Sequence, residues 1–257
     1  MQTSVQPSRD ASAQYLLRLA DTCLILGQRL AEWCGHAPIL EEDIALTNTS
    51  LDLIGQARAL LTQVGQRSAV PLDEDQLAFL REERDYLNVT MVELPRGDFA
   101  FTVLRNVMIA TFLKLVWQRL ADSSDAELAA IAGKAVKEAR YHQQHAGDWV
   151  VRLGDGTDES RQRMESALAT LWRYTPELFE ADSVDEQAAA MGLGPRWSEL
   201  QAPWLEEMRA LLSEASLSVP ADGAFRSTGK RGLHSEHMGH MLTEMQYLQR
   251  AYPGGVW

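Results

Sequence analysis

Residues 128–153 read LAAIAGKAVKEARYHQQHAGDWVVRL, and this stretch decides the fold class. Its apolar and small residues recur in alternating steps of four and three, which places them along one face of an α-helix. The predicted inward face consists of Leu128, Ala132, Ala135, Ala139, His142, Ala146, Trp149 and Leu153. The helix is expected to run from about 124 to 154, where a Gly-Asp-Gly turn ends it. A helix of this length favours a bundle over a stack of short helical repeats.

The rest of the chain follows the same period, and strictly alternating β-branched runs are absent, so we predict an all-α protein. The other expected helices cover about 13–34, 39–66, 74–94, 99–122, 157–191, 197–216 with a local break at Pro203, and 234–252. Asp98 is the expected N-cap of the helix that follows it. Residues 217–233 form the one long loop. The connection from the second to the fourth helix is long, which matches the crossover of ferritin-like four-helix bundles.

We therefore expect one ferritin-like helical domain over residues 13–257, with additional helices around the bundle. Residues 1–12 contain Arg9 but no apolar core of a signal peptide, and we interpret them as a flexible N-terminal arm. Cys23 and Cys34 fall on one predicted helix, roughly 16 Å apart, which is too far for a disulfide. A cytoplasmic location is the simplest inference from that.

Composition excludes several function classes. The 257 residues carry 24 Lys and Arg against 36 Asp and Glu, a formal net charge of −12, which argues against nucleic acid as a partner. The most apolar stretch, 103–117, is interrupted by Arg105, Asn106 and Lys114. It falls short of about 18 uninterrupted apolar residues, so we expect no membrane partner.

A long helical bundle can be tested for a di-iron centre, which needs one Glu from each of two helices and a Glu-x-x-His motif from each of the other two. His142 lies on the predicted inward face, but Ala139 stands three residues before it, where a ligand Glu would be. Glu138 is off that face by about 100°. On the second helix the nearest match is Leu53-Ile54-Gly55-Gln56, in which Leu53 and Gln56 occupy the two ligand positions. We interpret the chain as a bundle that has lost its iron centre, with vestigial ligand positions Leu53, Gln56, Ala139 and His142.

Four segments carry a family resemblance. They are LGQRLAEWCGHAP (26–38), LDLIGQAR (51–58), KEARYH (137–142) and GKRGLHSEHMGHMLTEMQYLQR (229–250). They resemble the PaaC family, the structural, non-catalytic subunit of the multicomponent ring-1,2-phenylacetyl-CoA epoxidase (phenylacetate-CoA oxygenase). The resemblance spans nearly the whole chain after the first dozen residues.

The resemblance implies a ferritin-like scaffold that supports a separate catalytic PaaA-type subunit. That subunit would hold the di-iron cofactor, bind the CoA thioester and insert one oxygen atom from O2 into the aromatic ring. A reductase would supply electrons from NADPH, and further subunits of the complex are expected partners. No cofactor and no catalytic residue are expected in this chain, and an exposed apolar surface is expected on it when it is purified alone.

The competing hypothesis is a metal-dependent enzyme in its own right. His237, His240 and Glu244 share one face of the last predicted helix and could hold Zn or Fe, with His234 and Glu236 nearby. Glu138 and His142, one turn apart, could exchange a proton. A polar or interface role for these histidines, and a hydrogen-bonded core role for His142, are the alternatives that we favour.

A basic patch precedes the last helix. Arg226, Lys230 and Arg231 lie in a glycine-containing loop, an arrangement that can hold a phosphate such as those of CoA. The segment lacks P-loop spacing, and its three cations could equally pair with acidic neighbours.

Overall fold

A computed structural model describes residues 4–221 and 223–255 of the chain. Within those ranges the regular structure is helical, and the backbone pairing between strands is limited to one isolated antiparallel bridge between Thr228 and Leu233. The all-α prediction is confirmed. The chain divides into two compact units, Met1–Pro95 with Ser227–Trp257, and Arg96–Arg226. The single domain over 13–257 and the flexible arm over 1–12 stay predictions, and residues 1–3 of that arm lie outside the described ranges.

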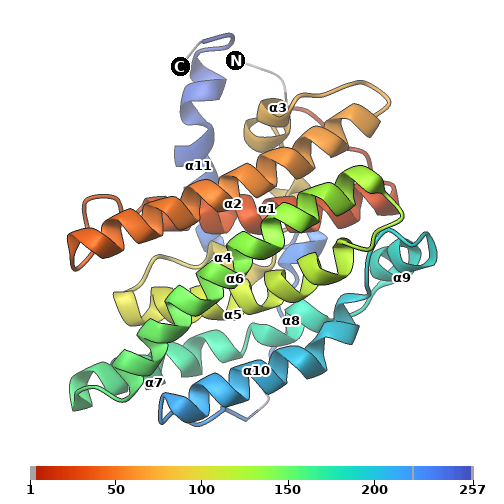
Figure 1. Cartoon of the computed structure of the whole chain (residues 1–257). Helices are drawn as coiled ribbons and strands as arrows, with labels where there is room; N and C mark the ends of the chain where they lie inside the picture. The colour runs from red at the N-terminus through yellow and green to blue at the C-terminus, as the bar shows by residue number, and fades with distance from the viewer. Residues whose placement is uncertain (1–3, 222, 256–257) are drawn as a thin grey trace. The chain divides into compact units, whose positions relative to one another are not determined.

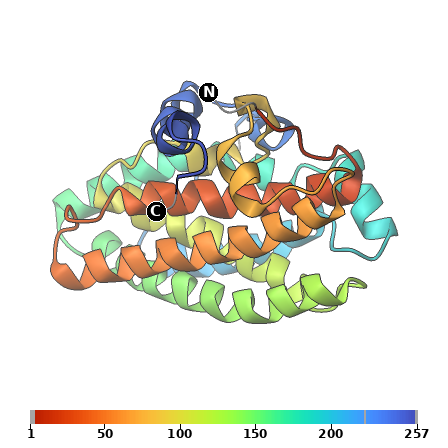
Figure 2. The same cartoon turned by 90° about the horizontal axis from the view of Figure 1, so that it is seen from above.

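The first unit is built on two long helices, α1 (Ala11–Ala31) and α2 (Leu40–Arg67), which pack side by side (Figures 1 and 2). Asp10 caps α1 by accepting a hydrogen bond from the Ala13 N–H at 2.8 Å. The two helices approach closely at Gly27, whose carbonyl accepts from the Ser50 hydroxyl at 2.8 Å. The remaining elements of this unit are α3 (Glu74–Phe79), the 3-10 turn η1 (Glu83–Asp85), α4 (Thr90–Glu93), the 3-10 turn η3 (Gly229–Arg231) and α11 (Glu236–Ala251).

The prediction of one helix over residues 74–94 was wrong. The helix stops at Phe79, and the chain continues through η1 and an extended stretch to the single turn of α4. The Arg81 guanidinium donates to the backbone carbonyls of Leu77 and Asp85, and the Leu87 N–H donates to the side chain of Asp21. Tertiary hydrogen bonds therefore replace the i to i−4 ladder in this segment.

The second unit centres on α5 (Phe99–Leu120) and α6 (Ala126–Gly154). α5 packs against α6, α7 (Asp158–Trp172) and α10 (Gln201–Glu214), as Figure 1 shows. Asp98 caps α5, as predicted, by accepting from the Phe101 N–H at 2.8 Å. The shorter elements are α8 (Thr175–Phe179), α9 (Ser183–Ala190) and the 3-10 turn η2 (Trp197–Leu200).

Residues 157–191 are not one helix, contrary to expectation. Pro176 stands in the first turn of α8, where its ring cannot continue the preceding helix, and Asp182 begins α9 with a capping box. The break expected at Pro203 is also absent. That proline lies in the first turn of α10, where its missing N–H is not needed.

α5 is long and apolar enough to cross a membrane by length and composition. Of its most apolar 18-residue window, however, 83% is buried inside the protein. Lys114 on this helix pairs with Glu207 of α10. These features are those of the core helix of a helical unit.

Candidate functional site

The four positions that we interpreted as vestigial ligand positions are all buried. On α2, Leu53 is 2% exposed and Gln56 is 4% exposed. The Oε1 atom of Gln56 lies 3.6 Å from the Sγ atom of Cys23 on α1, so the thiol donates to the amide oxygen. Leu53 supplies no donor atom, and a neutral amide facing a thiol is a weak ligand for a hard, highly charged cation. The donor set on α2 does not fit a pair of iron ions.

α6 repeats the pattern in the second unit. Ala139 is 1% exposed and His142 is 5% exposed, which confirms that His142 points inward. Glu138 pairs with Lys134 one turn back, at 3.4 Å, and its side chain is 17% exposed. Towards the end of α6 the buried positions shift by one residue, to Val150 and Gly154 in place of Trp149 and Leu153. This drift is expected of a straight helix with 3.6 residues per turn.

Within the described residues, other His, Cys, Asp and Glu side chains do not form a ligand cluster either. Across residues 4–221 and 223–255, no group of three or more His, Cys, Asp or Glu side chains is placed to hold a metal ion. The C-terminal histidines divide into two kinds. His240 and Glu244 lie on the exposed side of α11, whereas the side chain of His234 is fully buried before the helix begins.

His234 belongs to a buried polar network in the first unit. Its Nδ1 atom lies 2.8 Å from Oε2 of Glu93, and its Nε2 atom donates to the Tyr86 carbonyl at 2.9 Å. The same carboxylate accepts from the Asn88 amide at 3.0 Å and from the Ser235 N–H. Burial alone would lower the pKa of His234, but its hydrogen bond to Glu93 and the charge of that carboxylate raise the pKa above its ordinary value.

A buried ion pair between Arg81 and Asp21 extends this network towards α1. Both side chains are fully buried, and Nη1 of Arg81 donates to Oδ2 of Asp21 at 2.9 Å. Burial would lower the pKa of Arg81, and the Asp21 carboxylate reverses this and raises it. The guanidinium lies over the ring of Tyr86, 4.1 Å from its centroid. Gln246 of α11 closes the network by donating to the Tyr86 hydroxyl at 2.8 Å and to the Arg81 carbonyl at 3.0 Å.

These contacts explain the structural role of segment 229–250. This segment is one of the four that carry the family resemblance. Its residues His234, Ser235 and Gln246 bind the segment 81–93. Sequence reasoning did not identify Asp21, Arg81 or Glu93. The one available signal was a charged residue inside an apolar helical run, as at Asp21 between Ala20 and Thr22.

The structure does not place Arg226, Lys230 and Arg231 in one exposed patch. Arg226 is exposed and donates to the carbonyls of Gly223 and Phe225. Lys230 is 1% exposed, and its own carbonyl accepts from Nε of Arg18 at 3.2 Å. Arg231 is exposed. A buried lysine cannot contribute to a surface phosphate site as predicted.

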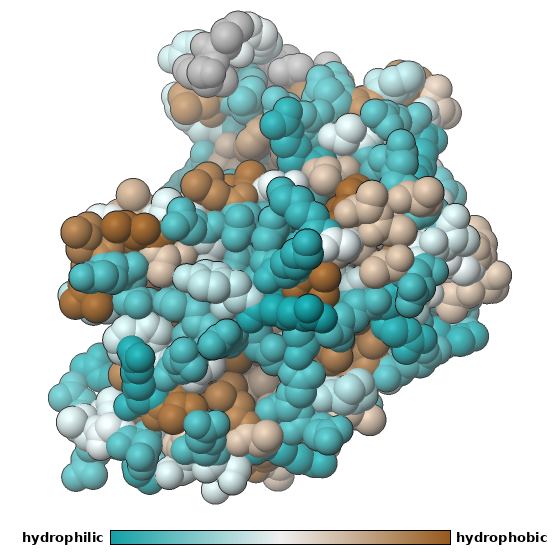
Figure 3. Space-filling model, in the orientation of Figure 1, coloured by the Kyte–Doolittle hydropathy of each residue, from teal (hydrophilic) through white to brown (hydrophobic). Residues whose placement is uncertain are grey.

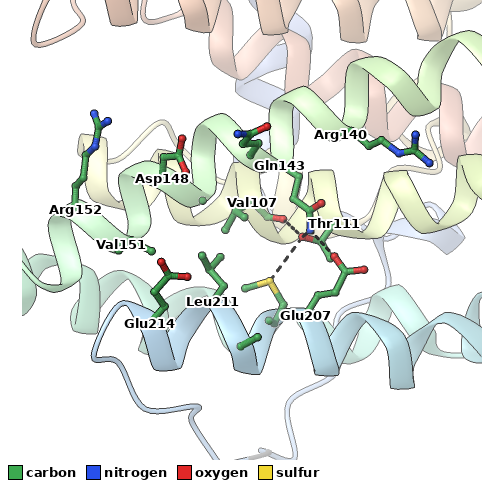
Figure 4. A pocket seen from close by; sticks show the side chains of 14 residues that line it. Val107, Thr111, Arg140, Gln143, Asp148, Val151, Arg152, Glu207, Leu211 and Glu214 are labelled. Carbon is green, nitrogen blue, oxygen red and sulfur yellow. Dashed lines mark hydrogen bonds between the residues drawn. The ribbon is translucent and has the colours of Figure 1, made fainter.

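The second unit contains a groove of about 730 Å³ between α6 and α10, with α5 at its floor (Figure 4). At one end Glu207 accepts from Lys114 and from the Gln143 amide, the latter at 2.6 Å. The Gln143 amide also donates to the Thr111 hydroxyl at 3.0 Å. Both the carboxylate and the hydroxyl are thus held by neighbours. The apolar floor and charged edges are features of a binding surface.

Comparison with known proteins decides the family. The sequence profile described as phenylacetic acid catabolic protein, which covers PaaA and PaaC, matches residues 1–257. The chain belongs to this family. A curated member, the C subunit of the 1,2-phenylacetyl-CoA epoxidase of Escherichia coli (strain K12), is 50% identical over 243 residues, covering 95% of this chain and 98% of that protein. The family resemblance predicted from the four segments is confirmed, and a ferritin-like fold is consistent with membership of the phenylacetic acid catabolic protein family.

Proposed function

We propose that this chain is the non-catalytic subunit of a bacterial multicomponent epoxidase that acts on the aromatic ring of phenylacetyl-CoA in phenylacetate catabolism. The observation that carries the proposal is the 50% identity to one subunit of the Escherichia coli enzyme along nearly the full length of both chains. Because that relative is named as a subunit, partners are expected for this chain as well. We place it in the cytoplasm with a PaaA-type catalytic subunit, further subunits and a reductase.

The side chains at the vestigial positions support a scaffold role. A di-iron centre needs carboxylates to neutralise its charge, and Leu53 and Ala139 offer no oxygen at the two positions where a ligand Glu would stand. We therefore assign the di-iron cofactor to the catalytic partner. The buried polar networks of this chain would then keep its fold rigid, and the catalytic partner would bind to the surface of that rigid fold.

The test is the metal content of the chain alone and of its complex with the co-expressed catalytic subunit, measured by elemental analysis after iron loading. We expect near-zero iron in the isolated chain and about two irons per pair of subunits in the complex. We also expect NADPH-dependent epoxidation of phenylacetyl-CoA by the reconstituted system to require this chain and to survive His142→Ala.

The alternative hypothesis, that this chain is itself a metal-dependent enzyme, predicts the opposite result. Stoichiometric iron or zinc in the isolated chain, lost in His142→Ala or His237→Ala, would assign chemistry to this subunit. Iron in the complex that is unaffected by either substitution would support the scaffold role.

A further inference from the structure

The outward face of α2 forms a regular seam. Between residues 41 and 58, six positions are exposed: Glu41, Ile44, Asn48, Leu51, Gly55 and Arg58. They are separated by alternating steps of three and four, which is the spacing of the a and d positions of a coiled coil. Ile44 is 53% exposed and Leu51 is 61% exposed. A half-exposed seam of this kind is suited to packing against another helix.

The seam continues into an apolar surface at the beginning of α2. Ile39 is 49% exposed and Leu40 is 73% exposed. Figure 3 shows this end of the helix as a brown region at the left edge of the molecule. Large aliphatic side chains gathered on one face of a soluble protein indicate an interaction site.

The sequence of the seam is complementary to itself in the antiparallel direction. A twofold axis between Thr49 and Ser50 brings Glu41 of one copy opposite Arg58 of the second copy. The same axis brings Ile44 opposite Gly55, and Asn48 opposite Leu51. An antiparallel coiled coil pairs a with d positions in this way, and a twofold interface presents each contact twice.

Both charge and shape favour this register. An acidic residue meets a basic one at each end of the seam, although each copy carries a net charge of −12. Arg58 pairs with Glu74 of its own chain at 3.0 Å, but its side chain is 73% exposed, so Glu41 of the second copy can join this pair. A Cβ atom built on Gly55 meets no heavy atom within 4 Å, so there is open space at this position for a large side chain. Ile44 of the second copy supplies one.

We propose that two copies of this chain associate through α2, antiparallel and about this twofold axis. The contact is between identical subunits and is independent of the proposed catalytic partner.

The first test exchanges the end charges. Glu41→Arg and Arg58→Glu each place like charges opposite each other at both ends of the seam. Because Arg58→Glu also removes the pair with Glu74, thermal unfolding must show that each variant keeps its fold. We expect each to weaken dimerisation about tenfold in sedimentation equilibrium, and the double variant to restore it. A monomeric native chain at about 50 μM, or a double variant no better than the singles, would overturn the proposal.

The second test uses two glycines that are matched in setting. Gly55 and Gly133 both lie within long helices, and neither has a heavy atom within 4 Å of a built Cβ. Gly55→Leu should block the entry of Ile44 and give a monomer, whereas Gly133→Leu should leave the dimer intact. Thermal unfolding of both variants shows whether the fold is kept. Equal dimerisation by the two folded variants would contradict the assignment.

The third test uses disulfide cross-linking to check which residues of the two α2 helices lie opposite each other. In a Cys34→Ser background, which removes the exposed native thiol, Asn48→Cys with Leu51→Cys should give an oxidised dimer. Moving the pair to the exposed α6 residues Lys134→Cys and Lys137→Cys should give little dimer. The same chemistry is then repeated in the complex with the catalytic subunit. Loss of co-purification in Gly55→Leu, together with no cross-linked dimer, would assign the seam to that subunit and refute the proposal.

Discussion

His234 is paired with Glu93, and its neighbours favour the charged form of the ring. The Nε2 atom of His234 faces the Tyr86 carbonyl, which can only accept, so this nitrogen carries a proton. The Glu93 side chain, which also accepts hydrogen bonds from Asn88 and Ser235, raises the pKa of His234. The raised pKa favours the imidazolium, in which Nδ1 also donates to Glu93.

Removing the carboxylate should be costly because it leaves the imidazolium buried without its counter-charge. We expect Glu93→Gln to lower the free energy of unfolding by about 3 kcal/mol. Urea unfolding followed by circular dichroism measures this. The exposed Glu83→Gln is the matched control and should lose less than about 0.5 kcal/mol. Equal losses for the two variants would contradict the buried pair.

The raised pKa of His234 gives the stability a pH dependence of definite sign. Because the folded state holds this proton more tightly than the unfolded state, the contribution is fully present below the ordinary value of 6.5. It is lost as the pH rises through the folded pKa, which lies above 6.5. The difference in unfolding free energy between the native chain and His234→Gln should therefore shrink between about pH 6 and pH 9. His240→Gln, at an exposed position, should give the native pH profile, and a difference that grows with pH would refute the sign.

The sequence predicts whether a side chain points inward when its position along a single helix is enough to decide this. The inward direction of His142 follows from helical spacing alone. Glu138, expected off that face, is nevertheless largely covered, with its side chain 17% exposed. The pair of Asp21 with Arg81 could not be predicted in this way, because its members are 60 residues apart and one of them lies outside any helix. Only the folded chain shows which charges meet.

Among the elements, the long helices were predicted to within a few residues and the short ones were not. α2 and α6 have many turns over which their apolar period repeats, so the pattern averages out local exceptions. α4 is a single turn and η1 has three residues, which is too short for any period to be seen. Pro176 and Asp182 were visible helix boundaries, and the prediction over 157–191 overlooked both.

The η3 turn fits closely against the segment before α4, which makes its first residue sensitive to size. A Cβ atom on Gly229 would lie 2.5 Å from the Asn88 carbonyl oxygen and 2.8 Å from the Thr90 hydroxyl. We expect Gly229→Ala to lower the free energy of unfolding by about 2 kcal/mol, since backbone must move to admit the methyl group. It should also increase proteolysis within residues 217–233.

Gly223→Ala is the control for that substitution. It lies in the same loop, but the nearest heavy atom to its built Cβ is 4.0 Å away. Unfolding in urea and limited trypsin digestion should not distinguish it from the native chain. If Gly229→Ala behaved like this control in both measurements, the results would contradict the close packing of η3 against Asn88 and Thr90.

Binding of a catalytic subunit should increase the free energy of unfolding of this chain. A partner that binds only the folded chain raises the free energy of unfolding by about 2.7 kcal/mol when its concentration is a hundred times the dissociation constant. We expect the thermal midpoint of this chain to rise on titration with the purified catalytic subunit, and not with an equal concentration of serum albumin. No shift in a titration that reaches saturating concentrations would count against the proposed complex.

The first unit is discontinuous in the chain, because residues 96–226 are inserted between its two parts. The ribosome therefore completes the inserted unit before it makes His234 and Gln246, although domains are usually finished in the order in which they emerge. Until then Glu93 and Tyr86 have no partners from the C-terminal segment. Nascent chains would therefore lack these partners of Glu93 and Tyr86 through about half of synthesis, and a chain truncated before residue 227 would contain a finished inserted unit and an unfinished first unit.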